Sequence, residues 1–250
     1  MTTVAPIQEV TAQTVDMAWA PLIIAVAPNG ARRTKVDHPS LPMTARESAE
    51  EAALCRDAGA AMIHLHVRDD DGHHSLDADR YRDAIAAVRD TVGDDLIIQL
   101  TTEAVGIYSA PEQMTMVREV RPEAVSTAVR ELIPDAISEP VAAAFYEWAA
   151  HEHIAVQFIL YDGGDVRRFA DLRRRGVIPG DVVSVLYVLG RYAKDQKSRP
   201  SDLLEFMDAA RDVDADWHWS VCAFGALEGA CALAAASFGG HARVGLENNL

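Results

Sequence analysis

Short apolar runs alternate with amphipathic, helix-like segments along most of this chain of 250 residues. Strand-like runs of this kind number eight and are typically followed by a segment with helical spacing. They lie at residues 22–27, 60–67, 96–102, 124–129, 154–160, 182–189, 217–222 and 242–248. Strands that alternate with helices pair in parallel, and eight such units favour a (β/α)8 TIM barrel over an open doubly wound sheet.

The two ends of the chain set the expected domain organisation. Residues 21–250 are predicted to form one barrel domain, and residues 1–20 an N-terminal extension. The last strand-like run ends two residues before Leu250, so the sequence predicts a barrel without a helix after strand eight. The extension or a neighbouring subunit would then have to cover that outer surface, unless the chain is shortened.

Composition excludes several classes of function. The net charge of −15 argues against nucleic-acid binding, which requires a cationic surface. No apolar run approaches the roughly 20 residues of a membrane span, and the N-terminus lacks the pattern of a secretory signal. The three cysteines show no Cys-x-x-Cys spacing, so we expect a reducing, cytoplasmic setting.

Two histidines interrupt the apolar run at residues 60–67. Because side chains alternate along a strand, His64 and His66 are expected to project to the same face. Two imidazoles so placed can bind one metal ion, typically zinc, and a pair of hydrogen-bonded core histidines is the alternative. The same spacing in His151 and His153 closes a helical run, where residues two apart do not face each other, so that pair is expected at the surface.

The last apolar run brings charged residues that can complete a metal site. Alternation over residues 242–248 places Arg243 and Glu247 on one face, directed into the barrel if the apolar residues between them pack on helices. Barrel closure puts strand eight beside strand one, with strand two next. Glu247 is therefore expected to reach an ion held by His64 and His66. An Arg243–Glu247 ion pair inside the barrel is the alternative.

Five motifs resemble those of the β-keto acid cleavage enzymes, whose namesake member is the 3-keto-5-aminohexanoate cleavage enzyme. The resemblance covers about residues 21–250, and the second and last motifs are specific when they occur together. The motifs are Pro21-Leu-Ile-Ile, Ile63-His-Leu-His-x-Arg-Asp-x-Asp-Gly, Ile98-Gln-Leu-Thr-Thr, Arg121-Pro-Glu and Gly239-Gly-His-x-Arg-Val-Gly-Leu-Glu-Asn-Asn.

The resemblance implies a zinc-binding (β/α)8 homotetramer that cleaves a β-keto acid with acetyl-CoA. The products are acetoacetate and a new CoA ester. By motif, zinc would lie on His64, His66 and Glu247, and the substrate-binding hydroxyls match Thr101 and Ser126. An enolate would form at C2 of the β-keto acid, attack acetyl-CoA and lead to carbon–carbon cleavage, with Arg243 stabilising an oxyanion or holding a carboxylate.

Two positions depart from the family pattern, and both lose a carboxylate. Asn248 stands where the family usually has an aspartate that pairs with the arginine, and Arg32 stands where it has a glutamate. We therefore treat Asn248 as a candidate catalytic position with altered chemistry. Arg32 belongs to a basic loop with Arg33 and Lys35, which either meets an anionic substrate or CoA phosphate or is a solvated charge run. A later basic segment that begins at Arg191 allows the same two interpretations.

The sequence thus predicts a zinc-dependent acyl-transferase that acts on a small β-keto acid and a CoA thioester. One alternative is a diverged barrel that retains zinc but runs an aldol-type lyase or hydrolase reaction without CoA. The other is a non-catalytic barrel that binds a metal or ligand, which the loss of two carboxylates makes conceivable.

Overall fold

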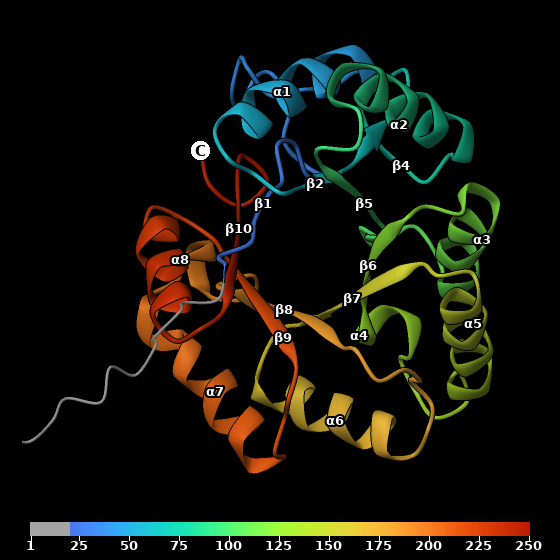
Figure 1. The fold of residues 1–250 in the computed structure, drawn as a ribbon, viewed down its shortest axis with the longest axis vertical. Coiled ribbons are helices and arrows are strands. Elements are labelled where there is room, and N and C mark those ends of the chain that lie inside the picture. The colour runs from blue at the N-terminus through green and yellow to red at the C-terminus, as the bar shows by residue number, and fades with distance from the viewer. Residues whose placement is uncertain (1–20) are drawn as a thin grey trace, which may run out of the picture.

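The computed structural model describes residues 21–250, in which eight parallel strands close into a barrel (Figure 1). Their spatial order is β1-β10-β9-β8-β7-β6-β5-β2, so the first and last strands are neighbours. The (β/α)8 prediction is confirmed. The barrel strands are β1 (Ile24–Val26), β2 (Met62–Leu65), β5 (Ile97–Thr101), β6 (Ala124–Ala128), β7 (Ala155–Leu160), β8 (Ser184–Leu189), β9 (His218–Ala223) and β10 (His241–Val244).

Helices connect consecutive barrel strands and surround the barrel (Figure 1). At the first of them, the capping box is formed as expected: the Glu47 N–H donates to Thr44 Oγ1 (3.2 Å) and the Thr44 N–H to Glu47 Oε2 (3.1 Å). The connecting helices are α1 (Ala45–Asp57), α2 (Ala78–Val92), α3 (Ala110–Val120), α5 (Glu139–His151), α6 (Gly163–Arg174), α7 (Leu203–Asp212) and α8 (Glu228–Ser237), with the shorter α4 (Val129–Leu132), η1 (Lys194–Gln196) and η2 (Pro200–Asp202) in loops.

Within residues 21–250, β10 is followed by a turn and by no further helix, as the sequence predicted. The predicted N-terminal extension, residues 1–20, lies outside the described residues. Among the helices that the structure describes, each is too short or too polar to cross a membrane.

The strand that carries the histidines ends earlier than predicted. β2 stops at Leu65 because the Asn29 side chain takes the backbone of His66, donating from Nδ2 to its carbonyl oxygen (2.8 Å) and accepting its N–H at Oδ1 (3.4 Å). The chain then enters a small antiparallel hairpin that the sequence pattern did not predict, formed by β3 (Val67–Arg68) and β4 (His74–Ser75).

The last strand is also shorter than predicted. β10 ends at Val244 instead of extending to residue 248, because Gly245 turns the backbone at a φ of 137° and lies against strand β1. A Cβ on Gly245 would fall 2.4 Å from the Ala27 carbonyl oxygen, so only glycine fits. Glu247 therefore lies on a turn beyond the strand, and the prediction from alternation that placed it on the strand was wrong.

Apolar side chains fill the layer between strands and helices, and a polar chain crosses the barrel interior. Gln99 Nε2 donates to Gln157 Oε1 (3.3 Å), and Gln157 Nε2 donates to Ser184 Oγ (3.1 Å). At its other end Gln99 Oε1 meets Nδ1 of His64 (2.8 Å). Buried polar groups are thus paired from β2 to β8, and this network fixes the base of the pocket above it.

Candidate functional site

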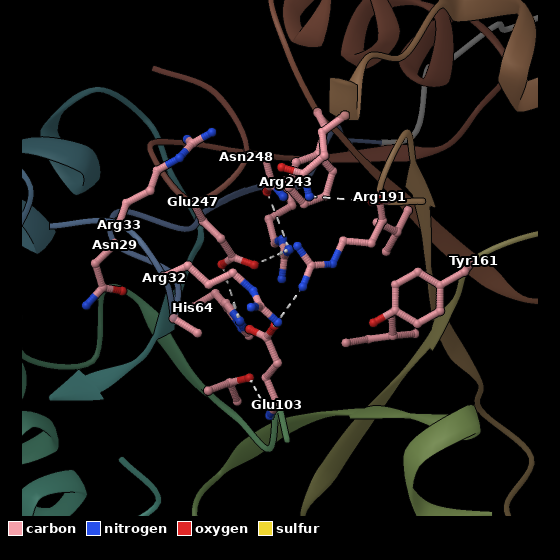
Figure 2. Close-up of a pocket in the computed structure, with 17 residues that line it drawn as sticks. Asn29, Arg32, Arg33, His64, Glu103, Tyr161, Arg191, Arg243, Glu247 and Asn248 are labelled. Atoms are coloured by element: carbon pink, nitrogen blue, oxygen red, sulfur yellow. Dashed lines mark hydrogen bonds and ion pairs between the residues drawn. The ribbon is translucent and has the colours of Figure 1, made fainter. Parts of the chain in front are cut away.

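A cavity of about 90 Å³ opens at the carboxyl ends of the barrel strands, where active sites of this fold lie (Figure 2). It is framed by the loop after β1, the ends of β2 and β5, and the turn after β10. Its polar lining includes Asn29, Arg32, Arg33, His64, Thr101, Glu103, Tyr161, Arg191, Gln196, Arg243, Glu247 and Asn248.

Three potential metal ligands converge beside this cavity. Nε2 of His64 lies 3.2 Å from Nε2 of His66, and Glu247 Oε2 lies 3.7 and 3.3 Å from these two nitrogens. Ligand atoms bound to zinc at about 2.0–2.1 Å in a tetrahedral arrangement stand about 3.3 Å apart. Glu247 Oε2 is buried without a hydrogen-bond partner among the described residues. The spacing and this unpaired oxygen fit one shared cation.

The protonation states of the three groups suit a metal. Burial lowers the pKa of His64 well below its usual value, and the nearby Arg243 cation lowers it further. Burial alone would raise the pKa of Glu247, but Arg243 and His66 hold it well below its usual value. A neutral imidazole and an ionised carboxylate are the forms that bind zinc.

Neighbouring side chains orient both imidazoles. Gln99 Oε1 accepts Nδ1–H of His64, which leaves the Nε2 lone pair directed at the shared centre. Asn29 fixes the backbone of His66, as described above. This support converts two local strand positions into one rigid donor pair.

Glu247 is held in place by the loop after β1. Gly30 packs directly against it, and Arg33 Nη1 donates to the carbonyl oxygen of Leu246 (2.6 Å). Arg68, buried at the end of β3, holds that loop by donating to the carbonyl oxygens of Gly30, Ala31 and Arg33. The turn after β10 and the loop after β1 therefore form one unit.

Arg243 forms the predicted internal ion pair, and this does not prevent Glu247 from reaching the histidines. Nη2 of Arg243 donates to Glu247 Oε1 (3.0 Å) and to Asn248 Oδ1 (3.4 Å), so the carboxylate serves Arg243 with one oxygen and the histidines with the other (Figure 2). Burial disfavours the cation, but Cys222 and Glu247 raise the pKa of Arg243. Burial raises the pKa of Cys222 to about 11, so it is a thiol at neutral pH.

The two candidate hydroxyls are neighbours with different exposure to the cavity. Thr101 and Ser126 are register partners on β5 and β6. Thr101 lines the cavity, and its Oγ1 accepts the N–H of Glu103 (3.0 Å), which leaves the hydroxyl proton free to be donated. Ser126 Oγ is fully buried and has no hydrogen-bond partner in the described part of the chain, and Ser126 does not line the cavity.

The basic loop divides into residues inside and outside the cavity. Arg32 and Arg33 line it, together with Arg191 from the later basic segment. Lys35 points elsewhere and pairs with Glu47 on α1 (2.9 Å). The comparison pair His151 and His153 is exposed at the end of α5, as expected.

Sequence reasoning missed two carboxyl groups near the mouth. Glu103 follows β5 and lines the cavity, and Arg191 Nη2 donates to its Oε1 (3.2 Å). Glu131 on α4 accepts the N–H of Ala104 (3.0 Å), and burial, with Glu103 nearby, raises its pKa to about 7. The available signal was an acidic residue directly after Thr101-Thr102, at the carboxyl end of a barrel strand.

Known proteins with related sequences agree with this picture. The 3-keto-5-aminohexanoate cleavage enzyme of Fusobacterium nucleatum subsp. nucleatum is 30% identical over 234 residues, covering 92% of this chain and 83% of that protein. The 3-oxoadipate:acetyl-CoA acetyltransferase of Cupriavidus necator is 27% identical over 235 residues, covering 92% and 81%. Both share nearly all of the barrel described here.

Solved structures share the fold at lower identity. The apo structure of ObcA superposes with a TM-score of 0.66 at 17% identity, covering 85% of this chain and 56% of that chain. A type I 3-dehydroquinate dehydratase from Clostridium difficile gives a TM-score of 0.60 at 13% identity, covering 90% and 84%. The sequence model of the beta-keto acid cleavage enzymes matches residues 21–250. This chain therefore belongs to the β-keto acid cleavage enzyme family.

Proposed function

We propose that this chain is a zinc-dependent acyl-transferase that cleaves a small β-keto acid with acetyl-CoA, giving acetoacetate and a new CoA ester. The convergence of His64, His66 and Glu247 at the mouth of the barrel carries the proposal. Relatives named for transfer reactions with acetyl-CoA support the choice of co-substrate.

The donor set suits a catalytic zinc site. Two imidazoles and one carboxylate occupy three positions and leave room for substrate oxygens. Zn²⁺ bound there supplies Lewis acidity that polarises a keto group and makes the adjacent C–H more acidic. Gln99 and Arg243 hold the ligands that carry it.

The other pocket residues have roles that follow from their free donors and charge. Arg243 stays protonated beside Glu247 and stabilises a carboxylate or a developing oxyanion. Thr101 donates its hydroxyl proton to a substrate oxygen, since its lone pair already receives Glu103 N–H. Ile159, Val188 and Phe224 form an apolar wall of the same cavity, which limits water at the reacting carbon.

We further propose that the protein assembles as a homotetramer. Apolar side chains on and beside α8 are exposed, with Leu227 46%, Leu233 68% and Phe238 55% accessible. Leu22 and Ile23, which precede β1, are also exposed. Apolar groups of this kind are commonly covered by partners. Light scattering at micromolar concentration should give the mass of a tetramer, and a monomeric mass would refute the assembly.

The reaction is tested by turnover of a panel of β-keto acids with and without acetyl-CoA. Acetoacetate release that requires acetyl-CoA supports the proposal. Turnover of the same acids without any CoA thioester would contradict it in favour of a lyase or hydrolase reaction. No turnover across the panel by zinc-loaded protein would point to a binding protein.

A further inference from the structure

The mouth of the cavity carries more positive than negative charge, in a chain whose net charge is −15. Glu247 is matched by Arg243, and Glu103 is matched by Arg191. The surplus therefore lies with the remaining two guanidinium groups, on the loop after β1. The charged lining residues are Arg32, Arg33, Arg191 and Arg243 against Glu103 and Glu247.

Of the two surplus groups, Arg32 is the one available to a ligand. Arg33 uses its guanidinium to hold the Leu246 carbonyl oxygen. Nη2 of Arg32 lies 3.9 Å from Glu103 Oε1, too far for a hydrogen bond, and its side chain is 57% exposed. It thus faces the cavity with donors that no other described residue engages through a hydrogen bond.

The position beside Arg32 already suits a carboxylate. Glu103 Oε1 lies between Arg32 and Arg191, and the two guanidinium groups approach it from opposite elements (Figure 2). Arg191 is only 18% exposed and lies over the ring of Phe224, 5.5 Å from its centroid. Guanidinium groups with this freedom bind carboxylates through two parallel hydrogen bonds.

Arg32 is also held in place before any ligand arrives. Arg68 donates to the backbone carbonyls on both sides of it, at Ala31 and Arg33. A loop fixed in this way loses little conformational entropy when it binds an anion, which increases affinity. The same loop carries Gly30 against Glu247, so the distance between Arg32 and the metal ligands is set by the fold.

We propose that Arg32, supported by Arg191, binds a second carboxylate at the far end of the β-keto acid. The preferred substrates are then β-keto dicarboxylates, whose first carboxylate and keto group lie toward the metal ligands. This inference rests on the proposed function for the reaction but specifies its substrate class. A CoA phosphate offers the same anionic chemistry, and the experiment separates the two sources.

The test compares 3-oxoadipate with 3-oxohexanoate, which have the same six-carbon chain but end in a carboxylate and a methyl group. We expect kcat/KM to favour 3-oxoadipate by about 10- to 100-fold, the contribution of a charge-assisted hydrogen-bonded pair. Arg32→Gln should reduce this ratio at least about tenfold, chiefly through KM for the dicarboxylate. Lys35→Gln is the matched control, because it removes a charge from the same loop outside the cavity, and it should preserve the ratio.

A binding measurement keeps the inference independent of turnover. Calorimetry on zinc-loaded protein should show adipate binding about tenfold more tightly than hexanoate, with the difference lost in Arg32→Gln and kept in Lys35→Gln. Equal affinity for the two acids, or an intact preference in Arg32→Gln, would overturn the inference even if the enzyme cleaves β-keto acids. A rise in KM for acetyl-CoA alone would also overturn it, since the anion would then be a CoA phosphate. Absence of turnover with preserved adipate selectivity would remove the proposed reaction and leave the anion site supported.

Discussion

Gly30 lies directly against Glu247, although the two residues are at opposite ends of the chain. A Cβ built on Gly30 would fall 2.5 Å from Glu247 Cγ and 2.9 Å from its Cβ, and the backbone of Gly30 has a φ of +63°. The loop after β1 thereby fixes the carboxylate that faces His64 and His66. A glycine with no polar side chain thus takes part in shaping the metal site.

Gly30→Ala should therefore weaken metal binding. The added methyl group must displace Glu247 or move the loop, and loss of ligand support typically lowers metal affinity about 10- to 100-fold. Zinc affinity by competition with a chelator measures the effect. Gly176→Ala is the control, because Gly176 also has a positive φ, +77°, but a Cβ added there would meet nothing within 4 Å. It should cost about 1–2 kcal/mol of stability and leave zinc affinity unchanged. Equal zinc affinity in the two variants would contradict this relationship.

Asn248 tests the loss of the carboxylate beside Arg243. Asn248 is fully buried and accepts from Arg243 Nη2 at 3.4 Å, so Asn248→Asp places a new negative charge against the guanidinium. We expect that charge to weaken the hold of Arg243 on an anionic substrate and to lower kcat/KM about tenfold, chiefly through KM. Steady-state kinetics on a cleaved β-keto acid separate the two constants. A marked rise in kcat would show instead that a proton-handling carboxylate is missing, since such groups contribute about 10²- to 10⁴-fold.

Glu131 predicts a specific dependence of stability on pH. Its pKa is about 7 in the folded protein, raised by burial from 4.5, so the folded state binds more protons than the unfolded state between these values. Stability is therefore lost as pH rises from about 4.5 to 7, by at most about 3 kcal/mol. Glu131→Gln keeps an oxygen to accept Ala104 N–H and should be more stable than the natural protein at pH 8, but not at pH 4.

Thermal unfolding at both pH values checks this expectation, and Glu47→Gln serves as a control of opposite sign. Hydrogen bonds from Met43 and Lys35 lower the pKa of Glu47 to about 2. Its contribution is present above about pH 4.5 and lost as pH falls toward 2, so Glu47→Gln should destabilise the protein at pH 8. A Glu131→Gln difference that does not change with pH would refute the assignment.

Local patterns were sufficient for the barrel and for the histidine pair. Alternating apolar runs predict strands wherever both faces are buried, and eight of them close into the observed ring. His64 and His66 are two residues apart, so their common direction depends on backbone geometry close to each residue. The same rule correctly separated them from His151 and His153, whose spacing falls on a helix end.

Long-range contacts and glycine turns were not readable in the same way. Glu247 reaches the histidines from a turn that Gly245 imposes, and strand alternation could not describe this path. Glu103 meets Arg191 from 88 residues away, and Gln99 supports His64 from the neighbouring strand. These pairs depend on where parallel strand ends meet in space, which no local period encodes.

Zinc content provides the most direct test that His64, His66 and Glu247 hold one metal ion. Protein purified without added chelator should carry about one zinc per chain by elemental analysis. The His64→Ala/His66→Ala variant should carry almost none, and His151→Ala should carry the full amount, because His151 is exposed at the end of α5. Full zinc retention in the double variant, with its fold intact by circular dichroism, would contradict the metal site and the reaction built on it.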